Sequence, residues 1–151
     1  MTTPDDLEAY KTRWVYDDGG RGAAGFRGTA GDCVCRAVAI ASGLPYGEVY
    51  AALSDGAGSE RKSRGRSARN GIRVRRLWFR RYMQSMGWRW TATMGIGTGC
   101  TVHLRADELP PARLVVSLSK HYVAVIDGVI HDLSDESRAG TRCVYGYWSR
   151  A

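Results

Sequence analysis

Residues 119–132 read Ser-Lys-His-Tyr-Val-Ala-Val-Ile-Asp-Gly-Val-Ile-His-Asp. Two apolar runs flank the pair Asp127-Gly128, which is a strong signal for a two-residue turn between antiparallel strands. The pattern therefore predicts a β-hairpin whose strands cover residues 121–126 and 129–133.

The same turn fixes the register of the hairpin. With residues 127 and 128 in the turn, Ala124 faces His131 across the strand pair. Because side chains alternate along a strand, His121 and Asp132 project from one side, whereas His131 projects from the other. The hairpin therefore selects His121, rather than His131, as the neighbour of Asp132.

Residues 32–43 predict a buried amphipathic helix that begins close to Cys33. Small and apolar side chains recur at helical spacing, and Gly43 supplies a C-terminal cap. Asp32 is the expected N-cap, because its carboxylate can accept bonds from first-turn amides. The glycine-rich residues 17–31 predict a loop that leads into this helix.

Further along the chain, helical patterns are followed by short strand patterns. Helices are predicted over 46–53 and 73–86, and strands over 101–104, 114–119 and 143–148. This order predicts an α+β domain with N-terminal helices packed on a mainly antiparallel β-sheet. The 151 residues suit a single domain, 1–151, with a lead-in and loop at 1–28 and an exposed basic loop at 55–71.

Composition excludes several classes of protein. With 44% hydrophobic and 25% charged residues, the chain is typical of globular proteins rather than disordered or fibrous ones. No apolar run is long enough to span a membrane, and the acidic N-terminus does not resemble a secretory signal. We therefore expect a cytoplasmic protein with no membrane partner, in which Cys33, Cys35, Cys100 and Cys143 are reduced.

Cys33 and His121 are the candidate catalytic residues. A helix N-terminus stabilises a thiolate, which is the reactive form of cysteine, and a histidine can act as its base. Asp132 is placed to orient the imidazole and to stabilise its protonated form. Each residue alone has an ordinary structural explanation, such as a small buried thiol or a core histidine. Their combination favours a nucleophilic hydrolase.

The chain resembles the papain-like cysteine peptidase superfamily, in which a cysteine opening the first long helix meets a histidine and an aspartate or asparagine from a later sheet. Segments 31–37, 119–125 and 140–148 are also similar to small bacterial and bacteriophage proteins. The resemblance implies a papain-like fold and hydrolysis of an amide, peptide or isopeptide bond without a cofactor. It implies a protein or peptide substrate, and an acidic substrate would suit this basic chain. It also implies a location in the cytoplasm of a bacterial cell or phage-infected host.

One feature of that superfamily is missing here. Papain-like enzymes place a glutamine shortly before the cysteine to bind the oxyanion, whereas residues 27–32 read Arg-Gly-Thr-Ala-Gly-Asp. The backbone amide of Cys33 would then act together with Arg27, Thr29 or Asn70. The sequence does not choose among these three side chains.

A second interpretation concerns the basic segment. Residues 61–81 hold ten lysines and arginines and no acid, a composition that favours binding to the phosphates of nucleic acids. In the predicted helix, Arg73, Arg76 and Arg80 form one polar face that suits a phosphate backbone or an acidic partner. A solvated helix face explains the same pattern more simply.

A metal site is a third interpretation. Cys33 and Cys35, together with Cys100, His103 and Cys143, are ligand types that zinc prefers. Paired knuckles of the Cys-x-x-Cys kind are absent from the sequence, so we expect no metal. Cys35, Cys100 and Cys143 are expected to act as small packing residues.

Overall fold

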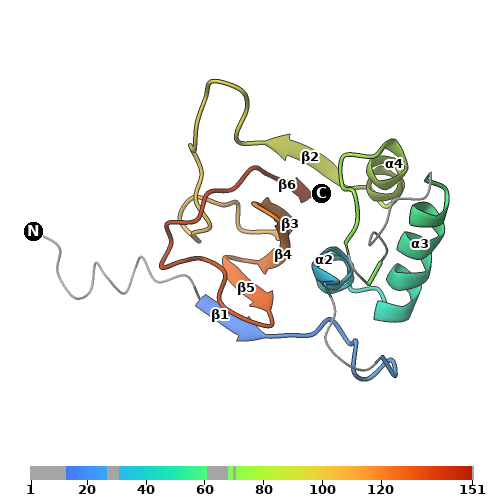
Figure 1. Ribbon diagram of the computed structural model, residues 1–151. Coiled ribbons are helices and arrows are strands. Elements are labelled where there is room, and N and C mark those ends of the chain that lie inside the picture. The colour runs from blue at the N-terminus through green and yellow to red at the C-terminus, as the bar shows by residue number, and fades with distance from the viewer. Residues whose placement is uncertain (1–12, 27–30, 61–67, 70, 151) are drawn as a thin grey trace, which may run out of the picture.

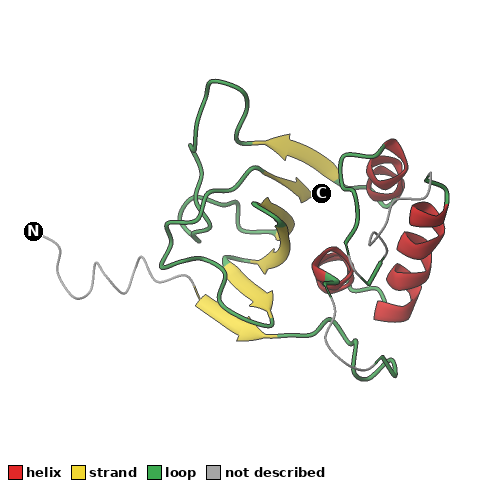
Figure 2. Cartoon of the chain, viewed as in Figure 1, coloured by secondary structure: helices red, strands yellow, loops and turns green. Residues whose placement is uncertain are grey.

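The structure, a computed structural model, describes residues 13–26, 31–60, 68–69 and 71–150. Within these residues it contains three helices and one six-stranded sheet, so the predicted α+β class is confirmed (Figures 1 and 2). The helices are α2 (Cys33–Ser42), α3 (Tyr46–Gly58) and α4 (Leu77–Ser85). The strands are β1 (Arg13–Tyr16), β2 (Arg89–Ala92), β3 (Arg113–Leu118), β4 (His121–Ile126), β5 (Val129–Asp132) and β6 (Gly146–Ser149).

The strand order in the sheet is β1-β5-β4-β3-β6-β2. The β1–β5 pair is parallel and the other four pairs are antiparallel, so the sheet is mixed. Strand β1 lies within the segment predicted as a lead-in. All four of its residues are exposed, and the run Arg-Trp-Val-Tyr shows no alternation of apolar and polar residues, although Trp, Val and Tyr favour strands.

The predicted hairpin is confirmed, including its register. Ala124 pairs with His131 in the β4–β5 ladder. Asp127 and Gly128 have φ values of 49° and 80°, the combination that a two-residue turn of this hand requires. A Cβ atom at position 128 would lie 2.8 Å from Cβ of Ala106, so glycine also lets this neighbouring loop approach closely.

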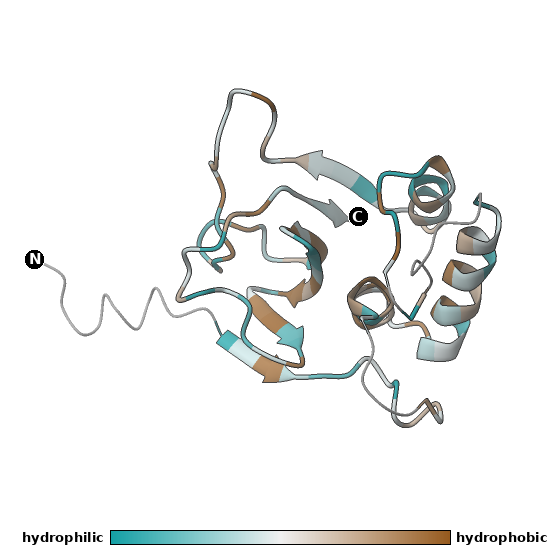
Figure 3. Ribbon diagram, viewed as in Figure 1, coloured by the Kyte–Doolittle hydropathy of each residue, from teal (hydrophilic) through white to brown (hydrophobic). Residues whose placement is uncertain are grey.

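The sheet separates two apolar clusters. On the helix side, α2 packs on β3, β4 and β5, and the buried side chains of α2 meet Tyr122, Ala124 and Trp148. A second cluster lies on the other face of the sheet. Its strand residues include Leu114, Val125 and Ile130, and the loop residues Leu104, Leu109 and Val144 cover them. Figure 3 shows the apolar character of α2 and of the central strands. Both faces of the central strands are therefore buried.

Several predicted boundaries were wrong. Helix α3 extends to Gly58, because its last turns pack toward α4, so the predicted exposed loop at 55–71 begins in helix. Residues 61–67 and 70 of that loop lie outside the described residues. Helix α4 begins at Leu77 rather than residue 73, since extended backbone at Arg76 precedes it. The predicted strand at 101–104 is reduced to one bridge, between His103 and Cys143.

The expectation of four reduced thiols is contradicted. Cys100 and Cys143 form a disulfide with a Cα–Cα distance of 5.7 Å, although 43 positions separate them in sequence. Pairing of their two segments brings the sulfur atoms together, and nothing local in the sequence signals that contact. Cys33 and Cys35 are the free cysteines of the structure. In the described part of the chain, no helix has both the length and the apolar character needed to cross a membrane.

Candidate active site

Cys33 is the first residue of α2, as the sequence predicted. Asp32 occupies the N-cap position, but its carboxylate makes no capping bond to the backbone, which corrects the predicted role. Instead Asp32 is buried, pairs with Arg36 one turn later and accepts a 2.6 Å bond from the hydroxyl of Tyr46. These charged and hydroxyl partners satisfy the buried carboxylate in place of the first-turn amides.

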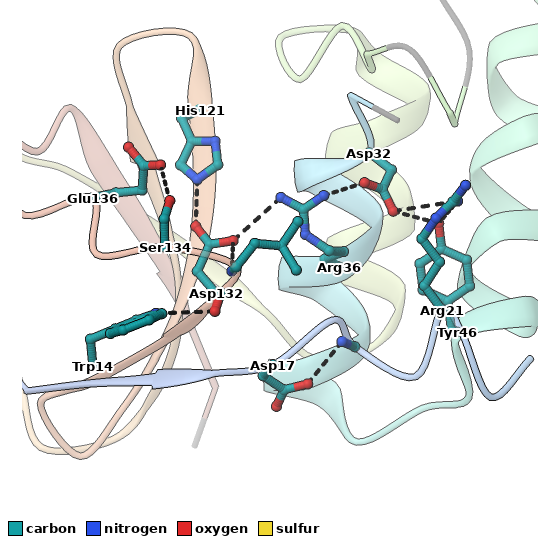
Figure 4. Close-up of polar contacts among 12 residues, drawn as sticks. Trp14, Asp17, Arg21, Asp32, Arg36, Tyr46, His121, Asp132, Ser134 and Glu136 are labelled. Atoms are coloured by element: carbon teal, nitrogen blue, oxygen red, sulfur yellow. Dashed lines mark hydrogen bonds and ion pairs between the residues drawn. The ribbon is translucent and has the colours of Figure 1, made fainter. Parts of the chain in front are cut away.

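His121 and Asp132 are in direct contact. Nε2 of His121 lies 2.7 Å from Oδ2 of Asp132, as the hairpin register predicted (Figure 4). His121 begins β4 and Asp132 ends β5, so both side chains lie at strand ends. At that end they reach beyond the sheet toward α2, where Arg36 also binds Asp132.

Cys33 and His121 line the same cavity, and each changes the pKa of the other. Burial raises the pKa of the Cys33 thiol, but the bond to His121, the positive charges of His121 and Arg36 and a backbone bond from Tyr122 bring it below its ordinary value. Burial lowers the pKa of His121, but the bonds to Asp132 and Cys33 raise it to about 9. These directions favour a thiolate beside an imidazolium.

Asp132 is held as a carboxylate. Burial raises its pKa, but the bond from His121, the backbone N–H of Leu133 at 2.7 Å and the charge of Arg36 bring it below its ordinary value. Its own carbonyl accepts a 3.1 Å bond from the indole N–H of Trp14 on β1. The aspartate is therefore fixed from three elements of the fold.

Arg36 links the two buried aspartates. It pairs with Asp32 through Nη1 and lies 3.3 Å from Oδ1 of Asp132 through Nη2. Arg21 extends the network, because its Nη1 donates a 2.9 Å bond to the hydroxyl of Tyr46 (Figure 4). Sequence reasoning missed Arg36, Arg21 and Tyr46. For Arg36 a signal existed, since it stands four residues after Asp32 on a helix and so on the same face.

Cys35 differs sharply from Cys33 although only one residue separates them. It is completely buried, and its Sγ lies 3.9 Å from the carbonyl oxygen of Tyr46. Burial raises the pKa of the Cys35 thiol to about 12. Cys35 is therefore an unreactive packing residue, as the sequence predicted.

Cys33 and His121 line the same cleft. This cavity of about 710 Å³ is also bordered by Ile72, Lys120 and Tyr145. A second cavity of about 780 Å³ adjoins the first, and it is lined by apolar and aromatic side chains and by two arginines. The residues that line both cavities are Val74, Arg75, Ser117, Tyr122 and Tyr145. Cys33 and His121 thus border a groove that the two adjoining cavities form.

The structure leaves some predicted site residues undescribed and separates others. The oxyanion candidates Arg27, Thr29 and Asn70 lie outside the described residues. Arg73 and Arg76 precede α4, so the predicted helical face of Arg73, Arg76 and Arg80 does not form. Arg73 lies 3.9 Å from Glu60, whereas Arg80 stacks on Trp148 and borders the second cavity.

Two groups of described residues have the composition of metal ligands. One consists of His121, Asp132 and Glu136, and the other of Cys100, His103 and Cys143. In the first group Glu136 is already paired with Arg142 at 2.7 Å and Asp132 with Arg36 at 3.3 Å. Those carboxylates are neutralised by the protein, so the first group has little need of a cation.

Known proteins give no independent guide to this site. No family model matches the chain, and neither the curated proteins nor the solved structures contain a significant match. The candidate site therefore rests on its own geometry and electrostatics.

Proposed function

We propose that the protein is a cysteine-nucleophile hydrolase with a papain-like arrangement, in which Cys33, His121 and Asp132 cleave an amide, peptide or isopeptide bond. The observation that carries the proposal is that Cys33 and His121 line one cleft, while Nε2 of His121 lies 2.7 Å from Oδ2 of Asp132. The pKa of the Cys33 thiol is lowered, while that of the His121 imidazolium is raised to about 9. Both changes favour a thiolate beside an imidazolium.

The proposed reaction follows from that charge distribution. The Cys33 thiolate attacks the carbonyl carbon, and the imidazolium of His121 gives its proton to the leaving amine as the C–N bond breaks. Water, deprotonated by His121, then attacks the thioester and restores the free thiol. Asp132 holds the ring by its 2.7 Å bond throughout.

The groove supports a chain-like substrate with acidic character. Arg75 borders both cavities and Arg80 borders the second, where Trp90 and Trp148 provide apolar walls. Lys120 adds a further positive charge beside His121. Such a surface suits a peptide segment that combines carboxylates with bulky apolar side chains.

The function is tested by exposing denatured protein mixtures and peptide libraries to the wild type and to Cys33→Ala, and by sequencing the new N-termini. Cleavage by the wild type alone is the expected result. An acyl-enzyme trapped on Cys33 by a peptidyl electrophile, and lost in His121→Ala, supplies a second readout. Equal cleavage by the wild type and Cys33→Ala contradicts the proposal.

A second candidate function is binding of single-stranded nucleic acid. The stacking of Arg80 on Trp148, with Arg75 and Trp90 along the same cavity, combines cationic and aromatic surfaces as such binders do. Salt-sensitive binding of oligonucleotides that survives Cys33→Ala and is weakened by Arg80→Ala distinguishes this function from hydrolysis.

A further inference from the structure

The structure brings together Cys100, His103 and Cys143, which come from two paired segments, residues 93–104 and 142–145. One ligand atom from each residue lies within 4.8 Å of the ligand atoms of the other two. Cys143 faces His103 across an antiparallel bridge, and the disulfide joins it to Cys100. Cys100 is exposed and the other two are half-buried, so a small ion can reach all three.

A carboxylate supports the histidine of this cluster. Nδ1 of His103 lies 3.1 Å from Oε1 of Glu108, and the other oxygen of Glu108 lies 3.3 Å from Nε of Arg105. A carboxylate on one ring nitrogen is the common outer partner of a metal-binding histidine, because it fixes the ring and leaves the other nitrogen for the ion.

The backbone holds the three side chains together independently of the disulfide. The N–H of Val144 donates to the carbonyl of Val102 at 2.8 Å, and that of Leu104 donates to Arg142 at 2.9 Å. The hydroxyl of Thr93 also donates to the carbonyl of Val144 at 2.7 Å. These bonds do not require a sulfur–sulfur bond, so the segments stay paired after reduction.

We propose that Cys100, His103 and Cys143 form a redox-controlled Zn²⁺ site that is closed by the disulfide and opened by reduction. A cellular dithiol breaks the S–S bond by exchange, itself becoming a disulfide, and leaves two thiols on the protein. Zn²⁺ then binds both sulfurs as thiolates and one imidazole nitrogen, and the two thiol protons go to solvent. A fourth position remains for water.

The ligand set decides the class of metal. Two soft thiolates and one imidazole favour Zn²⁺ over the hard cations Mg²⁺ and Ca²⁺, which take oxygen ligands. The proposal is independent of hydrolysis at Cys33, because none of the three ligands borders the cleft that contains Cys33 and His121.

The site has a structural consequence for the groove. The two segments that it joins also carry Met94 and Tyr145, which border the second cavity, and the N–H of Met94 donates to the carbonyl of Tyr145. Either the disulfide or the metal therefore fastens the wall of this cavity. The protein keeps one cross-link there in both oxidising and reducing surroundings.

The test is a Co²⁺ titration of the full chain, reduced and then freed of reductant under anaerobic conditions, with displacement by Zn²⁺. We expect one Co²⁺ per chain, with a thiolate-to-cobalt charge-transfer band and the visible spectrum of a tetrahedral site. The oxidised chain should give neither signal. Absence of binding by the reduced chain, or equal binding by the oxidised chain, overturns the proposal.

Variants identify the ligands. Cys100→Ser with Cys143→Ser should abolish the charge-transfer band, whereas Cys33→Ala with Cys35→Ala should retain it. Glu108→Gln leaves all three ligands in place and should weaken binding by about 10- to 100-fold. A band that persists without Cys100 and Cys143, or that depends on Cys33 and Cys35, overturns the assignment.

Discussion

Nη2 of Arg36 lies 3.3 Å from Oδ1 of Asp132, so the helix that begins with Cys33 is tied by an ion pair to the hairpin that carries His121. Through its other nitrogen Arg36 also pairs with Asp32. One buried cation thus neutralises an acid on each side of the candidate site. The position of His121 relative to Cys33 depends on this link as well as on the hairpin.

Replacement of Arg36 by Met should destabilise the fold by about 3–5 kcal/mol, because it leaves Asp32 and Asp132 buried without their shared cation. The free energy of unfolding in urea measures the loss. The exposed Arg81→Ala is the control and should change stability by less than about 0.5 kcal/mol. Similar stability of Arg36→Met and the wild type would show that the link contributes little.

The lowered pKa of Asp132 predicts a specific acid sensitivity. A carboxylate whose folded pKa is depressed contributes stability above its ordinary pKa, and that contribution is lost as the pH falls through the folded value. Wild-type stability should therefore fall more steeply below about pH 4 than that of Asp132→Asn. Unfolding midpoints measured from pH 7 downward, with the exposed Asp55→Asn as control, check this. Parallel curves for the wild type and Asp132→Asn would contradict it.

Two glycines of α3 should respond to alanine in opposite ways. A Cβ atom at Gly56 would lie 2.1 Å from the Trp78 ring, so Gly56→Ala should cost about 1–3 kcal/mol through overpacking. Gly58 has nothing within 4 Å of the same position, and Gly58→Ala should be neutral or stabilise the helix by up to about 1 kcal/mol. Thermal unfolding of the two variants compares them directly. Equal effects would show that α3 and α4 are not packed in this way.

Arg75 should set a preference for acidic substrates, because it borders both cavities of the groove. Once a cleaved peptide is known, Arg75→Gln should raise KM for its acidic form and leave kcat nearly unchanged, since the side chain takes no part in the chemical step. A matched peptide with neutral residues should be affected much less. An equal effect on both peptides would show that the charge of Arg75 does not set the substrate preference.

The sequence predicted the parts of the fold that local patterns determine. The Asp127-Gly128 turn and strict alternation gave the β4–β5 register, and with it the contact between His121 and Asp132. The capping glycine and apolar spacing gave α2, with Cys33 at its start. These features are determined by residues close together in the sequence, so one sequence alone is enough to predict them.

Long-range contacts could not be predicted in the same way. The exposed strand β1 has no alternation, and it is defined by pairing with β5 rather than by its own residues. The disulfide between Cys100 and Cys143 depends on two loops that meet only in the folded chain. The partner of Asp132 in α2, Arg36, is separated from it by 96 positions. These contacts form when distant segments are buried against one another. The periodicity of the sequence does not show which segments those are.

Activation of Cys33 by His121 is tested by the pH dependence of iodoacetamide labelling at each cysteine of the native protein. Mass spectrometry assigns the labelled sites in the wild type, His121→Ala and Asp132→Asn. We expect labelling of Cys33 well below about pH 8.5, a shift to higher pH without His121, and a smaller shift in Asp132→Asn. Cys35, with its pKa near 12, should stay unlabelled and serves as the internal control. Labelling of Cys33 only at the pH of an ordinary thiol, unchanged in His121→Ala, would show that His121 does not activate Cys33.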